Sequence, residues 1–213
     1  MKSEMVAKKL AKWHKSNWIS HPTPRLFNTL WKWFNGVPTT YSREQVQQKF
    51  ESKINMKYIK KELISLEKLL VQFDSPVVFC HNDLLSGNII FKGHEVDFID
   101  YEYGNYNFRG FDIANHFCEY AGFDCDFSKY PSKEFQIKWL ATYLQEFNST
   151  GTAEELEAVY KEVSTFSLAA HFFWGLWALI QAQYSDISFD YMSYSIMRFD
   201  EFEKAKLLLN NKS

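Results

Sequence analysis

The sequence predicts an α+β fold that is mainly helical and carries one small β element. Apolar residues recur at helical spacing through the first 73 residues, and this spacing returns after residue 110. Between these regions, from Pro76 onward, short apolar runs alternate with turn residues, which is typical of strands. The polar motifs of the chain gather on this β element. With 213 residues and 46% apolar content, the chain is long enough for one sizeable core.

Residues 1–73 are predicted to be mostly helical. Apolar residues at helical spacing mark a helix over 5–13, and a second short helix is predicted over 25–35. Ser42, followed three residues later by Gln45, resembles a capping box for the next helix. A further helix is marked by Met56, Ile59, Leu63, Leu66 and Leu70.

The β element is predicted from residue 77 onward. Residues 77–80 form a short apolar strand candidate, 81–87 have loop composition, and 89–91 with 96–99 predict a hairpin. After it, four helices are predicted over 110–120, 132–147, 152–184 and 190–208.

The charge balance excludes some partners. Lys+Arg 24 against Asp+Glu 26 gives a net charge of −2, without the basic field that recruits nucleic acid or anionic lipid. The apolar run 168–182 is shorter than the ~20 residues of a membrane span, so we expect a buried core helix there. Three cysteines without a CxxC pair favour a reducing, cytoplasmic location.

One polar motif points to chemistry. Asp83 and Asn88 stand five positions apart in the predicted loop, and Asp100 follows the predicted hairpin. Kinase-type phosphoryl transfer uses this order: an Asp that orients the attacking hydroxyl, then an amide and a carboxylate that bind Mg²⁺. Taken alone, an Asp-x4-Asn pair is a common turn pattern whose side chains cap their own backbone. The strand before the loop and the hairpin after it favour the kinase-like interpretation.

Three segments carry a family resemblance. Residues 79–90 resemble the phosphotransferase signature shared by choline, ethanolamine and aminoglycoside kinases. Residues 99–103, continuing through 106–117, resemble the second signature of choline and ethanolamine kinases, and residues 166–182 look like the late helix of that family. The chain is thus similar to the choline/ethanolamine kinase family over nearly its whole length, and most similar to the ethanolamine kinases.

The resemblance implies a fold and a domain division. It implies a protein-kinase-like C-terminal lobe, with residues 1–213 as a single domain. That domain would comprise a helical entry segment (1–73), the catalytic and metal-binding loops (76–112) and a helical substrate-pocket segment (113–213).

The resemblance also implies catalytic roles. Asp83 would be the base, while Asn88 and Asp100 would bind Mg²⁺, with ATP as the co-substrate. Asp112 would brace the catalytic loop, and Glu102 is a further candidate metal-site residue. His81 is expected to support the loop through hydrogen bonds rather than to transfer a proton, because Asp83 already fills that role.

In this family the amino-alcohol lies in an acidic and aromatic pocket. A substrate ammonium gains from ring faces and from a nearby carboxylate. For an arbitrary aromatic pair on a helix, ordinary core packing is the alternative. The matching positions here are Glu119, Trp174, Trp177, Phe189, Tyr191 and Tyr194.

The expected substrate is ethanolamine, phosphorylated for phosphatidylethanolamine synthesis, with choline as the alternative. The Asp-Leu-Leu sequence at Asp83 and the segment 119–123 both resemble the ethanolamine kinases. An aminoglycoside kinase shares only the first signature. A non-catalytic binding or dimerisation subunit is a further alternative, and a homodimer is left open.

The chain departs from the family in one respect. It contains neither G-x-G-x-x-G nor G-x-x-x-x-G-K-[ST], the loops that hold ATP phosphates. The resemblance therefore implies that the ATP-binding N-terminal lobe precedes residue 1 and is missing. We expect the isolated chain to phosphorylate ethanolamine very poorly. Ala114 also stands where the family usually has Gly.

Overall fold

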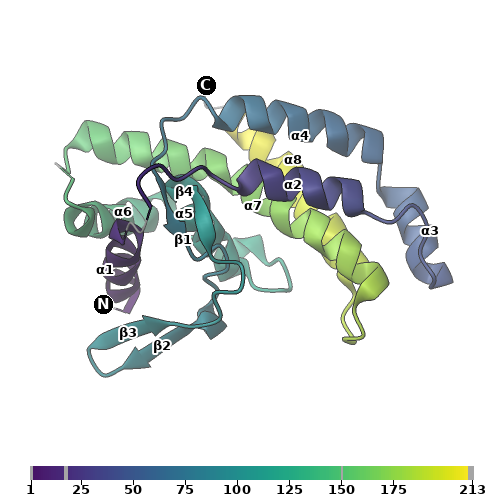
Figure 1. The fold of residues 1–213 in the computed structure, drawn as a ribbon, viewed down its shortest axis with the longest axis horizontal. Helices are drawn as coiled ribbons and strands as arrows, with labels where there is room; N and C mark the ends of the chain where they lie inside the picture. Colours follow the sequence, from purple (N-terminus) through teal and green to yellow (C-terminus); the bar gives the residue numbers. More distant parts are fainter. Residues whose placement is uncertain (1, 17–18, 150, 211–213) are drawn as a thin grey trace. The chain divides into compact units, whose positions relative to one another are not determined.

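The computed structural model describes residues 2–16, 19–149 and 151–210. Figure 1 shows its helices and strands. The chain divides into two compact units. The single domain with three segments that the sequence suggests stays a prediction. Unit 1 comprises Met1–Arg25, Asp74–Gly122 and Asp126–Phe166, and unit 2 comprises Leu26–Phe73, Phe123–Cys125 and Ser167–Ser213.

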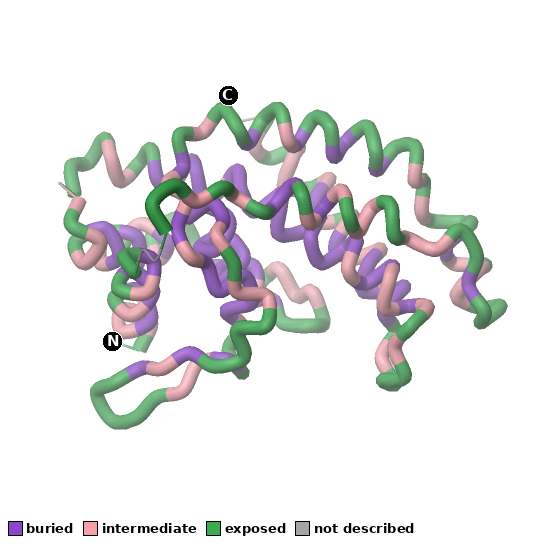
Figure 2. The backbone as a smooth tube through the Cα atoms, in the orientation of Figure 1, coloured by how far each residue is buried: buried purple, intermediate pink, exposed green. Residues whose placement is uncertain are grey.

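Two antiparallel ladders organise unit 1. Strand β1 (Val77–Cys80) pairs with β4 (Asn105–Phe108), and β2 (Ile89–Lys92) pairs with β3 (Glu95–Phe98). The first strand and the hairpin confirm the predictions from short apolar runs. Strand β4 was not predicted, because its sequence Asn-Tyr-Asn-Phe contains no apolar run. The hairpin projects from the unit, and much of it is exposed (Figures 1 and 2).

Helices enclose the β1–β4 ladder of unit 1. Helix α1 (Lys2–Lys15) packs along α6 (Lys133–Phe147) and also contacts β1. Helix α6 begins after Ser132, whose hydroxyl accepts from the Phe135 amide at 3.2 Å and so caps the helix. It ends at Asn148, which adopts the left-handed conformation.

Helix α5 (Arg109–Cys118) follows β4 directly and is buried along its whole length. A polar network holds its first turn against α7 (Ala153–Tyr184), whose residues up to Phe166 belong to unit 1. The Arg109 guanidinium lies 2.5 Å from a Glu162 oxygen, and the Ser75 hydroxyl donates to the other oxygen at 2.6 Å. The Gly110 amide in turn donates to the Ser75 hydroxyl at 3.1 Å.

Unit 2 is helical. It contains α2 (Leu26–Gly36), α3 (Glu44–Lys53), α4 (Met56–Leu70), the later part of α7 and α8 (Tyr191–Asn210). Helix α4 buries Ile59, Leu63, Leu66 and Leu70, as its sequence spacing predicts.

The predicted capping box at Ser42 and Gln45 does not form. Helix α3 starts one residue later than a Ser42 cap requires, with Arg43 at the N-cap and no side-chain cap. The backbone of this segment makes other hydrogen bonds instead: the Ser42 amide donates to Gln183 at 3.0 Å, and the Tyr41 amide donates to Gln47 at 2.7 Å. These contacts set the helix start in place of the local motif.

One helix in the described part of the chain, α7, is long and apolar enough to cross a membrane by length and composition. Of its most apolar window, 83% is buried inside the structure. This burial agrees with the core helix that the sequence predicts over 168–182.

Candidate active site

The loop 81–88, between β1 and β2, is held by side chains of unit 1. Asn82 has a φ of 64°, a left-handed conformation that Asn tolerates better than most residues. Its side chain donates to the Tyr103 carbonyl at 2.9 Å and accepts from the Asn107 amide at 3.1 Å. The Asn115 side chain donates to the Asn82 carbonyl at 3.0 Å. These hydrogen bonds specify one backbone conformation for the loop.

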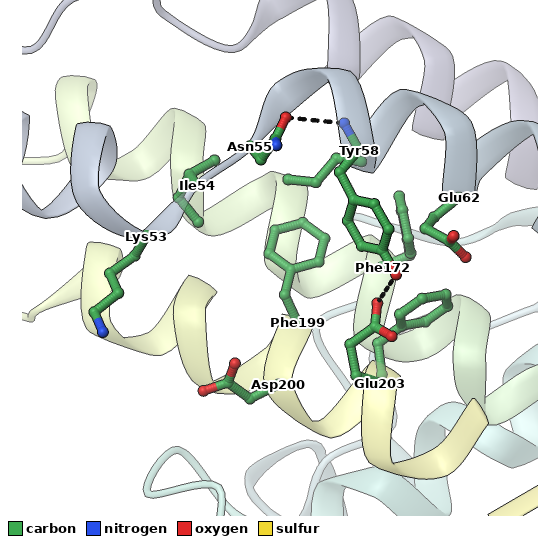
Figure 3. Close-up of a pocket in the computed structure, with 11 residues that line it drawn as sticks. Lys53, Ile54, Asn55, Tyr58, Glu62, Phe172, Phe199, Asp200 and Glu203 are labelled. Atoms are coloured by element: carbon green, nitrogen blue, oxygen red, sulfur yellow. Dashed lines mark hydrogen bonds between the residues drawn. The ribbon is translucent and has the colours of Figure 1, made fainter. Parts of the chain in front are cut away.

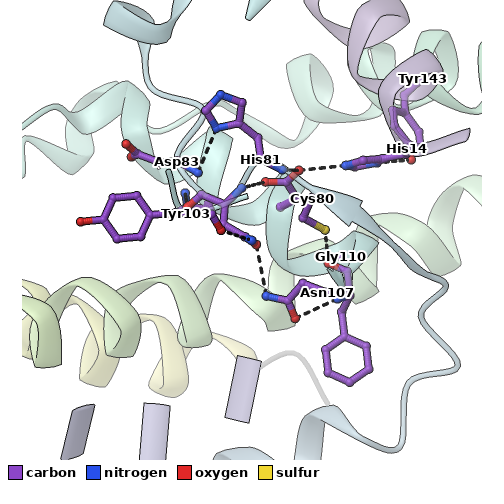
Figure 4. A network of polar contacts seen from close by, with 12 residues as sticks. His14, Cys80, His81, Asp83, Tyr103, Asn107, Gly110 and Tyr143 are labelled. Carbon is purple, nitrogen blue, oxygen red and sulfur yellow. Dashed lines mark hydrogen bonds and ion pairs between the residues drawn. The ribbon is translucent and has the colours of Figure 1, made fainter. Parts of the chain in front are cut away.

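Asp112 of α5 anchors the start of the same loop. Figure 4 shows the network of polar contacts around His81 and His14 to which it belongs. Its carboxylate accepts from the backbone amides of His81 at 2.8 Å and Asn82 at 2.7 Å. Burial raises the pKa of this carboxyl, but the hydrogen bond from His14 and those of the loop outweigh burial, so the net pKa is lowered. Asp112 is therefore an ionised, fully buried anchor, which is the bracing geometry expected of it.

Asp83 and Asn88 contact each other inside the loop. The Asn88 Nδ2 donates to the Asp83 carbonyl at 2.8 Å and lies 3.2 Å from the Asp83 carboxylate. Because Nδ2 points toward Asp83, the Asn88 Oδ1 is the atom that is left to bind a cation.

The hairpin links Asn88 to Asp100. The Ile99 amide donates to the Asn88 carbonyl at 3.1 Å and so extends the β2–β3 ladder to the residue before Asp100. Asp100 has a φ of 60°, a second left-handed residue at this site. The hairpin thus holds the backbones of these two predicted metal ligands at a set separation. Glu102 is exposed two residues further on.

His81 uses both ring nitrogens within the site. Its Nε2 lies 3.0 Å from the Ile99 carbonyl, and its Nδ1 lies 3.3 Å from the Asp83 amide. A neutral imidazole that donates from Nε2 and accepts at Nδ1 satisfies both contacts. This geometry ties the catalytic loop to the segment that precedes Asp100.

The site carries surplus negative charge. Burial, then the charges of Glu119 and Asp100, raise the pKa of Asp83 from 3.8 to about 8, and Glu102 adds a smaller effect. Among the described residues, Asp83, Asp100 and Glu102 form no ion pair with Lys or Arg. Carboxylate and amide oxygens with unneutralised charge fit a hard divalent cation such as Mg²⁺.

A different group of side chains is packed more tightly. In residues 2–16, 19–149 and 151–210, the group of three His, Cys, Asp or Glu ligand atoms within 4.8 Å of one another is His14, Cys80 and Asp112. Asp83, Asp100 and Glu102 do not form such a group among the described residues, so the three carboxylates do not all lie within 4.8 Å of one another.

Unit 2 brings the predicted substrate-pocket aromatics together. Neighbouring rings have centroids 4.9–6.2 Å apart, mostly in edge-to-face contacts. We call these side chains the aromatic cluster: Phe123, Trp174, Trp177, Phe189, Tyr191 and Tyr194.

One member of the aromatic cluster, Phe123, was not predicted. It contacts Phe189 and Tyr194 from the turn between the 3₁₀ helices Glu119–Ala121 and Phe127–Lys129. Its exposed fraction of 55%, large for a phenyl ring, could not be read from the sequence. Glu119, the remaining predicted pocket residue, lies in unit 1 at the C-cap of α5.

Sequence reasoning missed several residues that support the loop. Asn107 and Asn115 hold Asn82, the His116 Nδ1 lies 2.8 Å from the Leu84 carbonyl, and His14 contacts Asp112. Asn107, Asn115 and His116 fall inside the second signature. The concentration of amide and imidazole side chains in that segment was the signal in the sequence that could have identified them.

A cavity of about 150 Å³ opens in unit 2, lined mainly by residues of α4 and α8 (Figure 3). The Tyr58 hydroxyl donates to Glu203 at 2.8 Å across it. None of the predicted site residues is in its lining: Lys53, Ile54, Asn55, Tyr58, Ile59, Glu62, Phe172, Phe199, Asp200, Phe202 and Glu203.

Comparisons with known proteins bear on this geometry. The family model described as choline/ethanolamine kinase matches residues 1–203. The chain is 45% identical over 204 residues to the probable ethanolamine kinase A of Dictyostelium discoideum, covering 94% of this chain and 58% of that protein. It is 43% identical over 216 residues to ethanolamine kinase 1 of Mus musculus, covering 95% of this chain and 59% of that protein.

A solved structure is also similar. The ethanolamine kinase of Plasmodium vivax superposes with a TM-score of 0.85 at 31% identity, covering 94% of this chain and 58% of that one. The chain therefore spans less than two thirds of the length of these relatives.

Proposed function

Because this chain belongs to the choline/ethanolamine kinase family, we propose that it carries the catalytic loop and acceptor site of an ATP- and Mg²⁺-dependent ethanolamine kinase. The observation that carries the proposal is the buried Asp83, which lies beside Asn88 and within the field of Asp100 on a loop tethered by Asp112. Since the chain spans 58% of the Dictyostelium relative, the activity is proposed for the whole protein that contains these residues.

The proposed reaction transfers the γ-phosphoryl group of ATP to the hydroxyl of ethanolamine and gives phosphoethanolamine. Asp83 orients that hydroxyl and accepts its proton as the new P–O bond forms and the bond to ADP breaks. Asn88 Oδ1 and the Asp100 carboxylate would hold Mg²⁺, which when bound neutralises charge on the phosphates. Asp112 and His81 keep the loop in place.

The acceptor is proposed from two lines of support. The relatives named above are ethanolamine kinases, and the aromatic cluster offers ring faces that attract an organic ammonium by about 0.5–2 kcal/mol per good contact. Glu119 is proposed as the carboxylate that pairs with this ammonium. The product would enter phosphatidylethanolamine synthesis in the cytosol.

Choline is the second candidate acceptor. Ring faces suit a trimethylammonium group, which has no donors that need acceptors, at least as well as a primary ammonium. The choline kinase of Cryptosporidium parvum superposes with a TM-score of 0.77 at 25% identity. Turnover of the two amino-alcohols at equal concentration separates these candidates, and faster turnover of choline would reverse the assignment.

The central test is Asp83→Asn in the full-length protein. Loss of the base should lower kcat by about 10²–10⁴-fold while the fold is retained, because Asn preserves the size of the side chain. A coupled assay of ADP release measures kcat. The matched control is Glu95→Gln, an exposed carboxylate on the β2–β3 hairpin that follows the loop, which should leave kcat unchanged. An Asp83→Asn protein with more than a tenth of the parent kcat would remove Asp83 from the proposed role.

A further inference from the structure

Behind the catalytic loop, three helices of unit 1 contribute side chains to one continuous buried chain of hydrogen bonds. Tyr143 of α6 lies 2.7 Å from His14 Nδ1, and His14 Nε2 lies 2.8 Å from Asp112 Oδ2 (Figure 4). The exposed fractions of these residues are 0% for Tyr143, 2% for His14 and 0% for Asp112. The hydrogen bonds thereby join His14 to Asp112 and Tyr143, which lie 98 and 129 residues further along the sequence.

The protons in this chain can be assigned. The lowered pKa of Asp112 leaves its carboxylate ionised, so His14 Nε2 carries the hydrogen that it donates. Burial raises the pKa of Tyr143, which therefore keeps its hydroxyl hydrogen and can donate it to His14 Nδ1. With Nε2 donating to Asp112 and Nδ1 in contact with the Tyr143 hydroxyl, both ring nitrogens of His14 are engaged and its ring orientation is fixed.

Three donors share the two oxygens of Asp112. Oδ2 accepts from His14 and from the His81 amide, while Oδ1 accepts from the Asn82 amide. Without His14, the two backbone amides would be the carboxylate's main donors, and it could rotate about its last torsion. The side-chain plane of Asp112, and with it the backbone that leads into Asp83, depends on the imidazole.

These atoms also resemble a metal site, since His14, Cys80 and Asp112 lie within 4.8 Å of one another. Each ligand atom is already engaged in a hydrogen bond. Cys80 Sγ donates to the Phe108 carbonyl at 3.6 Å, and the His14 and Asp112 atoms have the contacts given above. Hydrogen bonds of normal length among all members favour a positioning network over a metal centre.

We propose that His14, held in orientation by Tyr143, is a positioning residue that orients the Asp112 carboxylate and so sets the catalytic loop carrying Asp83. The inference rests on the proposed function in one respect, that this loop is catalytic. The hydrogen-bond chain itself stands on the distances, so it can be tested with and without turnover.

The experiment uses Tyr143→Phe, which removes one hydroxyl, with His14→Gln and His14→Leu as a pair that keeps or removes the donor to Asp112. Amide hydrogen exchange at His81 and Asn82 is measured by NMR and compared with the amides of the β2–β3 ladder. Tyr130→Phe is the matched control, since its hydroxyl bonds to Gln136 and not to this chain.

Loss of one hydrogen bond should accelerate exchange at His81 and Asn82 by about tenfold relative to the ladder amides, with Gln at position 14 less affected than Leu. In the full-length protein, Tyr143→Phe should lower kcat by about three- to tenfold with little change in the KM for ethanolamine. Tyr130→Phe should change neither quantity selectively.

Equal acceleration at every amide, or none at His81 and Asn82, would overturn the inference, because either result means that the network contributes only general stability. If His14→Leu does not fold, the Tyr143→Phe comparison still decides the question. If the full-length protein shows no turnover of any amino-alcohol, the proposed function fails while the exchange result still tests the hydrogen-bond chain.

Discussion

At the residue scale, two buried carboxylates of one site have pKa values shifted in opposite directions. Burial and the charges of Glu119 and Asp100 raise the pKa of Asp83 to about 8, whereas the pKa of Asp112 is lowered because hydrogen bonds outweigh its burial. Environments that push two carboxyl groups apart in pKa give them different roles. Asp112 is suited to permanent anchoring, and Asp83 to an exchange of protons with a ligand.

The anchoring role of Asp112 predicts a pH-dependent stability difference. Because its pKa is below the ordinary 3.8, its ionised form stabilises the fold above about pH 4, and this contribution is lost as the pH falls through the folded-state pKa. Asp112→Asn should lower the free energy of unfolding by about 2–4 kcal/mol near pH 7, since the amide leaves buried donors poorly matched. Urea unfolding followed by tryptophan fluorescence measures the difference.

The difference in the free energy of unfolding between the parent and Asp112→Asn should narrow as the pH is lowered below about 4, because both proteins then carry an uncharged group at this position. Glu95 is exposed on the hairpin, so Glu95→Gln should unfold with almost the same free energy as the parent both near pH 7 and below pH 4. A gap that stays constant down to the lowest pH would contradict an ionised Asp112.

Some of the site residues were predictable from the sequence and others were not. Asp83, Asn88 and Asp100 could be picked out because they lie in one short stretch around a recognisable hairpin. His14 gave no such signal, since it sits on an ordinary amphipathic helix, 98 residues from the carboxylate it contacts. A local pattern cannot report a partner that only the packing of α1 against α5 and α6 supplies.

At the element scale, periodicity predicted the elements whose partners are local. The β2–β3 hairpin closes on itself through a two-residue turn, so both strands were predicted. Strand β4 pairs instead with β1, 25 or more residues away, and its Asn107 serves the loop rather than a core face. The capping box at Ser42 failed for the same reason, as long-range contacts outweighed a weak local motif.

The start of α5 predicts a sensitive glycine. A Cβ added at Gly110 would lie 2.7 Å from Glu162 Oε1 and 2.7 Å from a ring carbon of Phe166. Gly110→Ala should therefore lower the free energy of unfolding by about 1–3 kcal/mol through overpacking. The same unfolding experiment measures it.

Gly93→Ala is the matched comparison for Gly110→Ala. Gly93 has a φ of 61° but nothing within 4 Å of an added Cβ, so only backbone strain of about 1 kcal/mol is expected. If Gly110→Ala proved no more destabilising than Gly93→Ala, the close packing of α5 on α7 would be contradicted.

At the scale of the whole molecule, divalent-cation binding should be visible as a change in thermal stability. A ligand that binds the folded state at a hundred times its Kd stabilises it by about 2.7 kcal/mol. We expect Mg²⁺ with ATP to raise the Tm of the full-length protein, and EDTA to reverse the rise. Differential scanning fluorimetry measures both effects.

The rise in Tm on addition of Mg²⁺ and ATP should be largely lost in Asp100→Asn and retained in Glu95→Gln, because only the first substitution removes the charge of a proposed metal ligand. An Asp100→Asn protein that responds to Mg²⁺ as the parent does would place the cation elsewhere.

The family could be predicted from the order of three sequence blocks, whereas the division into two units could not. Helix α7 runs without interruption from Ala153 to Tyr184, yet its residues up to Phe166 belong to unit 1 and those from Ser167 to unit 2. A boundary inside a continuous helix has no glycine, proline or polar turn to mark it. Only the packing of its two halves reveals it.

The pairing of β1 with β4 restricts how this gene can change in length. Val78 lies opposite Asn107, whose side chain holds Asn82 at 3.1 Å. Gain or loss of a single residue inside β4 itself would turn Asn107 to the opposite face of the ladder. We therefore expect β4 to accept a substitution at its exposed first residue, Asn105, far more readily than a change in length.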